Sequence, residues 1–222
     1  MKYKFLLVFI AIFATNNITA QQKYEYVDLG LESKTLWAAC NVGAENPWEL
    51  GNYFAWGETA TKPDYSWLNY KYADGACDKM TKYCTSANHG SNNFFDNRTQ
   101  LEISDDAAAV KLGGNWRMPT ENEFKELQNS CIWLWTENYK QTGVSGYIIK
   151  SKCNDNTIFL PACGFRSNDS LLKEASGWYW TSTLYADYAN DARGFYFRSD
   201  TTYMHGHYRF QGFTIRAVCT KK

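Results

Sequence analysis

The sequence is short of proline and histidine, carries no net charge and lacks a long apolar run. Its 222 residues include four prolines and three histidines, with 23 basic and 23 acidic residues. Balanced charge argues against a nucleic-acid partner, which calls for a clustered basic face. Few prolines together with 17% aromatic residues argue against a disordered chain. The apolar run at residues 5–14 is too short to span a bilayer, which takes about 20 residues.

Residues 1–20 have the pattern of a secretory signal peptide. Lys2 and Lys4 supply the basic start, residues 5–14 the apolar stretch, and Ala20 a small residue at the cleavage site. We therefore expect an exported protein, periplasmic, secreted or at the cell surface, with no transmembrane segment after cleavage. An uncleaved anchor is the alternative. Residues 21–222 show no linker, repeat or low-complexity tract, so they predict a single domain.

Seven cysteines in an exported chain are typical of disulfides with one thiol left over. The pairs that we favour are Cys77–Cys84, Cys40–Cys131 and Cys163–Cys219, which leave Cys153 unpaired. The spacing does not fix this connectivity, and some of the cysteines could instead be small buried residues. No C-x-x-C pair occurs, so zinc is not expected.

Several independent sequence features predict the start of one helix. Thr120 is a favoured N-cap, and Glu123 follows at the spacing of a capping box. Pro119 and Phe124 occupy the positions of a hydrophobic staple. Apolar residues then recur at positions 124, 127 and 131, which predicts a helix over 121–130 with one buried face.

Strands and loops are expected over most of the remaining chain. The expected strands are 24–29, 35–41, 146–153, 157–163, 178–183, 194–199, 202–209 and 213–219, with the last near the first. Residues 64–97 predict a long loop, closed by the Cys77–Cys84 pair. Two further helices are expected, one over 105–112 between Ser104 and Gly113 and a short one over 45–53.

Residues 113–124 read Gly-Gly-Asn-Trp-Arg-Met-Pro-Thr-Glu-Asn-Glu-Phe. This string resembles the core signature of the Fibrobacter succinogenes major paralogous domain family, and it is distantly similar to a string in formylglycine-generating-enzyme-like domains. Further blocks match the first family in order, at residues 26–31, 35–44, 51–58, 158–166, 177–182 and 212–216. The resemblance implies an α+β, C-type-lectin-like fold with two principal helices, mainly antiparallel short strands, long loops and disulfide bracing.

The signature residues Trp116, Arg117, Pro119, Thr120 and Glu123 are expected to build the scaffold rather than a site. Arg117 would tie loops together through carbonyls or a carboxylate. Trp37, Trp56 and Trp180 are expected in the core.

Residues 181–210 are the candidate recognition segment. Tyrosines interleaved with short polar, arginine and histidine residues are typical of antibody paratopes, and aromatic faces also suit sugars. The resemblance points to the same late segment. The candidate ligand-binding residues are Tyr185, Tyr188, Asn190, Asp191, Arg198, Tyr203, His205, Tyr208 and Arg209. Strand alternation would place Phe195 and Phe197 inward and Tyr196 and Arg198 outward. The alternative is that these tyrosines only cover a sheet.

No metal or other cofactor is expected. His205 and His207 would point the same way on a strand, but Gly206 between them suggests a turn or bulge. Calcium is a lesser alternative, through Asp187, Asn190 and Asp191 or through Asp105 and Asp106, because the sugar-binding triplets of calcium-dependent lectins are absent.

No catalytic motif is readable either. The chain has no Gly-x-Ser-x-Gly elbow, and Cys219 lacks the nearby second cysteine of the formylglycine-generating enzymes. We therefore expect a non-catalytic module that binds glycan or protein at a bacterial cell surface. The alternatives are a structural or assembly subunit without a small ligand and a diverged oxidase-like enzyme.

Overall fold

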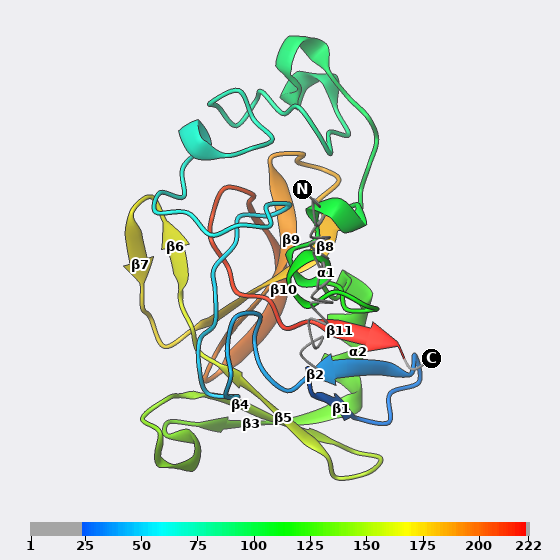
Figure 1. Cartoon of the computed structure of the whole chain (residues 1–222), viewed down its shortest axis with the longest axis vertical. Coiled ribbons are helices and arrows are strands. Elements are labelled where there is room, and N and C mark those ends of the chain that lie inside the picture. The colour runs from blue at the N-terminus through cyan, green and yellow to red at the C-terminus, as the bar shows by residue number, and fades with distance from the viewer. Residues whose placement is uncertain (1–23, 221–222) are drawn as a thin grey trace, which may run out of the picture.

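The computed structural model describes residues 24–220, so the expected signal peptide lies outside the described residues. The described chain is a mixed α+β structure in which short strands dominate (Figure 1). The strands are β1 (Tyr26–Asp28), β2 (Thr35–Ala38), β3 (Cys131–Thr136), β4 (Gly146–Ser151), β5 (Thr157–Pro161), β6 (Phe165–Ser167), β7 (Ser170–Leu172), β8 (Gly177–Leu184), β9 (Asp191–Arg198), β10 (Thr201–Tyr208) and β11 (Val218–Thr220). The α-helices are α1 (Ala107–Leu112) and α2 (Glu121–Ser130), and the 3-10 turns are η1 (Trp67–Asn69), η2 (Ala87–His89), η3 (Ser91–Asn93), η4 (Ile103–Asp105) and η5 (Tyr139–Gln141).

The strands form small antiparallel sheets. Their orders are β1-β2-β11, β10-β9-β8, β3-β4-β5 and β6-β7. The last strand, β11, pairs with β2, and β1 pairs with the other edge of β2, so the last strand lies near the first, as expected. Val27 of β1 and Val218 of β11 lie on either side of Trp37 in β2. The expected hairpin also forms, with β4 and β5 paired from Gly146↔Pro161 to Lys150↔Thr157. The strand expected over 213–219 is shorter and begins at Val218.

The α2 helix begins after its expected N-cap Thr120 and spans the expected residues, whereas α1 begins at Ala107, two residues later than expected. Thr120 Oγ1 accepts from the backbone N–H of Glu123, and Glu123 accepts from the backbone N–H of Thr120, which completes the capping box of α2. The α1 helix is capped by the Asp106 carboxylate rather than by Ser104, and it ends at Gly113 with φ 68°. This positive φ is one that glycine adopts without strain.

The short helix expected over 45–53 is absent. The segment forms turns instead, because the Glu49 carboxylate accepts hydrogen bonds from the backbone N–H groups of Glu45 and Asn46 at 2.8 and 3.3 Å. Side-chain bonding of this kind offers the backbone an alternative to a helix.

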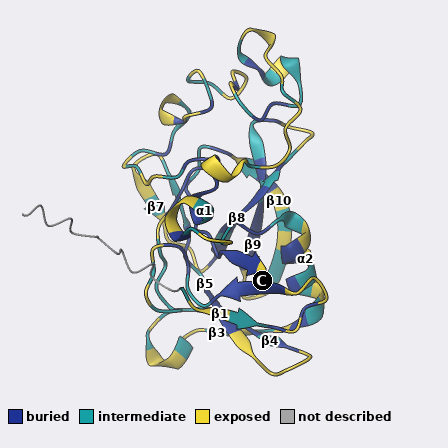
Figure 2. Cartoon of the chain, turned by 45° about the vertical axis from the view of Figure 1, so that its right-hand side comes forward, coloured by how far each residue is buried: buried dark blue, intermediate teal, exposed yellow. Residues whose placement is uncertain are grey.

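Residues 64–103 form a long excursion with only 3-10 turns, drawn at the top of Figure 1. The body below it contains two apolar clusters, and buried residues concentrate on its central strands (Figure 2). The first cluster surrounds Trp56, Trp180 and Phe213, beneath the excursion. The second surrounds Trp37 and Phe124, between α2 and the sheets. Trp37, Trp56 and Trp180 are fully buried, as expected.

All seven cysteines are free thiols in the structure, so none of the three favoured disulfides is formed. One sulfur of each favoured pair has a hydrogen-bonding partner instead. Cys84 Sγ lies 3.1 Å from the Ser86 carbonyl, Cys163 Sγ lies 3.1 Å from Thr214 Oγ1, and Cys40 Sγ lies 3.4 Å from the Glu45 carbonyl. Cys77 is exposed, and Cys131 and Cys219 are buried in different sheets. Within the described residues, hydrogen bonds and packing rather than disulfides hold the loops.

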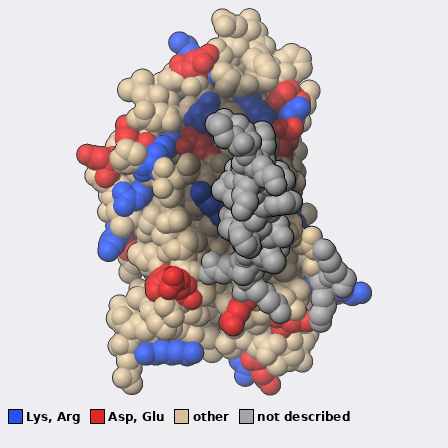
Figure 3. All heavy atoms as spheres, in the orientation of Figure 1, with Lys and Arg blue, Asp and Glu red and all other residues tan. Residues whose placement is uncertain are grey.

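Acidic and basic side chains are interspersed on the face drawn in Figure 3, so no field of one sign dominates it. Among residues 24–220, no helix is long and apolar enough to cross a bilayer.

Candidate ligand-binding face of the β8–β9–β10 sheet

The β8–β9–β10 sheet has one face in the core and one that opens to solvent. Phe195 and Phe197 point inward, where the Phe195 ring stacks on Phe124 with centroids 4.8 Å apart. This agrees with the alternation expected from the sequence. Arg198 is exposed on the opposite face, as expected, whereas Tyr196 points the same way but is buried by its neighbours.

An aromatic row crosses the outer face. Trp178 lies opposite Tyr196, which lies opposite Tyr203, so the three rings are direct cross-strand neighbours. The ring centroids are 4.5 Å apart for Trp178–Tyr196 and 4.7 Å apart for Tyr196–Tyr203. Such pairs stabilise a sheet and hold each ring in a fixed place. Tyr203 is 42% exposed at the end of the row, so the fixed row presents one accessible ring.

Two histidines extend the row along β10. The His205 ring lies 6.2 Å from Tyr203 and 5.6 Å from His207, which confirms that both histidines are on one side of the strand. His205 is exposed. His207 is enclosed by Trp178 and Phe213, and burial lowers the pKa of its imidazole to about 3. His207 therefore acts at neutral pH as an uncharged aromatic wall.

Glycines make room for these rings. A Cβ on Gly194 would lie 2.9 Å from His207 Cδ2, and a Cβ on Gly206 would lie 2.0 Å from Tyr185 Cδ1. Gly206 thus continues a regular strand and lets Tyr185 pack against it. The expectation of a turn or bulge at Gly206 is wrong, because glycine is needed here for the close approach of the Tyr185 ring and not for a bend in the backbone.

A hollow of about 400 Å³ adjoins the row at the end of β9. It is lined by Glu174, Ala175, Arg198, Ser199 and Asp200. Arg198 Nη2 lies 2.8 Å from Glu174 Oε2, and its guanidinium lies 5.7 Å from the Tyr196 ring centroid. The row and the hollow together place an exposed ring beside charged donors and acceptors.

Four candidate residues form a loop group between β8 and β9: Tyr185, Tyr188 and Asn190 lie on the connecting loop, and Asp191 is the first residue of β9. Tyr185 and Tyr188 rings are 5.7 Å apart, and the Arg193 guanidinium lies 4.0 Å from the Tyr185 centroid. Burial raises the pKa of Asp191 to about 6, against the lowering effect of His205, His89 and Arg209. Asn190 Oδ1 and Asp191 Oδ1 are buried and accept no hydrogen bond from the described residues.

Arg209 is fully buried, so its place on a recognition face was wrong. The residue follows β10, and its guanidinium turns inward to donate to the carbonyls of Tyr83, Ala189 and Lys82 at 2.8–3.1 Å. Tyr208, 49% exposed, stacks on Phe210 with centroids 5.8 Å apart. The nine candidates therefore divide into a sheet group (Arg198, Tyr203 and His205), a loop group, and two residues near the excursion.

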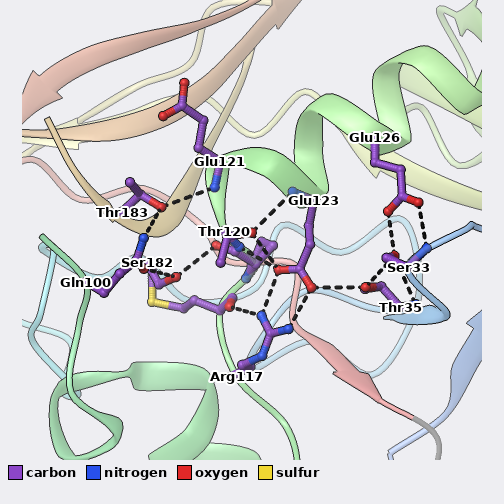
Figure 4. A network of polar contacts seen from close by, with 12 residues as sticks. Ser33, Thr35, Gln100, Arg117, Thr120, Glu121, Glu123, Glu126, Ser182 and Thr183 are labelled. Atoms are coloured by element: carbon purple, nitrogen blue, oxygen red, sulfur yellow. Dashed lines mark hydrogen bonds and ion pairs between the residues drawn. The ribbon is translucent and has the colours of Figure 1, made fainter.

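The signature residues build a polar hub beside this sheet (Figure 4). Arg117 forms a bidentate pair with Glu123, with Nη1–Oε2 and Nη2–Oε1 distances of 2.7 and 2.6 Å. Glu123 also accepts from Thr35 Oγ1 of β2 at 3.0 Å. The Pro119 carbonyl accepts from the backbone N–H of Ser182 in β8 at 2.8 Å. Trp116 is half-buried against the first apolar cluster. Each is thus tied into the scaffold, as expected.

Asp105 and Asp106, one of the two sets weighed for calcium, have other roles. Asp105 accepts from Lys82 Nζ and the Tyr83 hydroxyl, both at 2.6 Å, and Asp106 caps α1. No group of three His, Cys, Asp or Glu side chains within residues 24–220 has the geometry of a metal site.

Sequence reasoning missed three residues at this face, Trp178, Glu174 and Asp200, and it placed Tyr196 outward without counting it among the candidates. Alternation alone groups Trp178 with the buried Trp180, and only the pairing of Trp178 with Tyr196 across β8 and β9 places it in the aromatic row. Glu174 and Asp200 lie outside the strands, in connections whose geometry no short-range pattern specifies.

Comparison with known proteins adds one partial match. Residues 135–218 match a family described as Domain of unknown function (DUF8237), and this stretch runs from within β3 to the first residue of β11. No curated protein and no solved structure matches the chain. The matched segment contains the whole β8–β9–β10 sheet and neither of the α-helices.

Proposed function

We propose that this protein is an exported, non-catalytic binding module with a C-type-lectin-like fold, and that the outer face of its β8–β9–β10 sheet binds glycan at a bacterial cell surface. The observation that carries the proposal is the exposed Tyr203 ring, held by Tyr196 and flanked by His205. Sheet pairing fixes this ring before any ligand arrives, so binding orders few side chains. The fold assignment is supported by the sheet that joins β1, β2 and β11 and by the long excursion.

The chemistry of the face suits a sugar. The C–H face of a pyranose stacks on an aromatic ring such as Tyr203, while its hydroxyls require paired donors and acceptors. Arg198 supplies donors, and Glu174 and Asp200 supply acceptors around the adjoining hollow. A neutral ligand rich in hydroxyls matches this mixture better than a ligand of one charge.

A glycan array followed by titration calorimetry tests the proposal. Tyr203→Ala removes the stacking surface, and we expect it to weaken binding of the best array ligand by at least about tenfold, a change of about 1.4 kcal/mol. Tyr203→Phe keeps the ring and should retain most of the affinity. Tyr26→Ala is the matched control, because Tyr26 is a 46% exposed tyrosine on β1.

Two results would contradict the proposal. One is unchanged glycan binding by Tyr203→Ala. The other is an array without any ligand while surface extracts yield a protein that binds through the same face, which would favour the protein-ligand alternative.

A further inference from the structure

The β3 strand is an unprotected edge of the β3–β4–β5 sheet. It pairs only with β4, from Cys131↔Ser151 to Thr136↔Gly146. Among the described residues, no hydrogen bond reaches the backbone of β3 from its other side. Natural sheets blunt such edges with charges, proline or bulges. The sequence of β3, Cys-Ile-Trp-Leu-Trp-Thr, contains no charge and no proline, and its pairing with β4 is continuous.

The outer face of β3 itself exposes two aliphatic side chains. Ile132 is 44% exposed and Leu134 is 50% exposed; on β4, Ile148 lies directly opposite Leu134, and Lys150, which pairs with Asp155, lies opposite Ile132. On the other face, Trp133 and Trp135 are partly buried against Phe195 and Phe197, with centroids 5.4 and 6.3 Å apart. The strand is therefore anchored on one face and exposes two branched aliphatic side chains on the other.

We propose that a second copy of this chain pairs with β3, strand to strand and antiparallel, about a two-fold axis at Trp133. Residues opposite each other in a sheet have their side chains on the same face, and side chains alternate between faces along each strand. A two-fold axis between two copies of β3 must therefore pair even-numbered residues with even-numbered ones and odd-numbered residues with odd-numbered ones. With the axis at Trp133, Ile132 of each copy lies opposite Leu134 of the other. The two sheets become one continuous sheet, and the exposed aliphatic side chains cover each other.

Charge at the two ends of β3 is complementary in the same register. Glu137 follows β3 directly and accepts from Trp135 Nε1 at 2.6 Å, whereas Asn129 lies in the last turn of α2 just before the strand, so an antiparallel second copy brings the Glu137 end of one β3 toward the Asn129 end of the other. Lys152 Nζ donates to the Asn129 carbonyl at 2.9 Å and is exposed, so each acidic end meets a basic one. A parallel arrangement would instead bring the two copies of Glu137 together. Charge therefore favours the antiparallel second copy.

The test measures the mass of the protein by light scattering and sedimentation over a wide range of concentrations. We expect a dimer for the unmodified chain. Ile132→Lys and Leu134→Glu, each alone, put a charge against an aliphatic side chain at both contacts and should weaken the dimer at least about tenfold. The Ile132→Lys/Leu134→Glu double variant places opposite charges across the axis and should restore it.

Leu68→Lys is the matched control, because Leu68 is an 83% exposed leucine on the excursion and its replacement should leave the mass unchanged. A monomer at every concentration overturns the proposal. A dimer that survives both single variants places the interface elsewhere and also overturns it. A dimer that both singles break and the double variant leaves broken overturns the register, because only pairing of residue 132 with residue 134 predicts rescue.

Discussion

Two buried arginines hold two very different parts of the molecule. Arg216 precedes β11 and donates to the carbonyls of Ala38, Ala39 and Phe159 and to Asn41 Oδ1, at 2.9–3.1 Å. It joins the β1–β2–β11 sheet to β5, so each of the two parts that it links already belongs to a three-stranded sheet. Arg209 instead joins the excursion to the loop before β9, and the excursion pairs with the body only through isolated bridges such as Tyr65↔Asn168 and Gln100↔Thr183 among the described residues.

The two arginines use the same chemistry, since each is fully buried and neither forms an ion pair with a described carboxylate. Backbone carbonyls accept from both guanidinium groups, and Arg209 also lies 4.9 Å from the Trp56 ring centroid. The difference lies in what surrounds them. Arg216 reinforces a region that three-stranded sheets and the second apolar cluster also hold. Arg209 reinforces a segment that has no extended strand ladder and is otherwise held by isolated bridges and the first apolar cluster. One planar donor that reaches several carbonyls can thus help to order a long irregular segment.

The largest effect is expected from Arg216→Met. The change leaves several buried carbonyls in the core without donors, and each costs about 1–3 kcal/mol. We expect the free energy of unfolding to fall by about 3–5 kcal/mol in a single cooperative transition. Denaturant unfolding followed by tryptophan fluorescence measures it. A loss below about 1 kcal/mol would show that water replaces the arginine, and the core would then be less closed than its burial indicates.

Arg209→Met should reduce the free energy of unfolding less than Arg216→Met does, and it should increase local motion more. The variant leaves the carbonyls of Lys82, Tyr83 and Ala189 without donors at the edge of the body, where water can reach them after the excursion opens. We expect a global loss of about 1–3 kcal/mol together with faster amide exchange over residues 70–90. Arg216→Met is the matched comparison. Equal exchange changes throughout the chain in both variants would contradict the distinction between the two regions.

The sequence predicted features that depend on residues close together in the chain and missed contacts between distant segments, for a physical reason. The bounds of α2 follow from Thr120 and Glu123, because a capping box acts within four residues. Phe195 and Phe197 were placed inward by alternation, which depends only on strand geometry. Arg209 was misplaced because its partners are not near it in the sequence: Tyr83 in the excursion is 126 residues away and Ala189 in the loop before β9 is 20 residues away. The disulfide pairs failed similarly, since cysteine counting contains no distances.

The smallest effect, and the most selective, concerns Asp191 beside Arg209. Burial raises the pKa of this carboxyl to about 6 from its usual value near 3.8. The folded state therefore holds the proton more tightly than the unfolded chain, and the resulting stability is present at low pH and is lost as pH rises from about 4 to about 6. Asn carries no such charge, so Asp191→Asn should stabilise the protein by about 1–2 kcal/mol at pH 7 and change little at pH 4.

Asp105→Asn is the control of opposite sign. Burial would raise the pKa of Asp105, but Lys82 and the tyrosine hydroxyls lower it to about 2 overall. Its charged form therefore stabilises the fold above about pH 4, and the contribution is lost as pH falls toward 2. Asp105→Asn should destabilise at pH 7, where Asp191→Asn stabilises. Thermal unfolding of both variants between pH 4 and pH 8 separates them. Curves that shift in the same direction would mean that Asp191 has a stabilising partner, and the loop before β9 would then be anchored by charge as well as by Arg209.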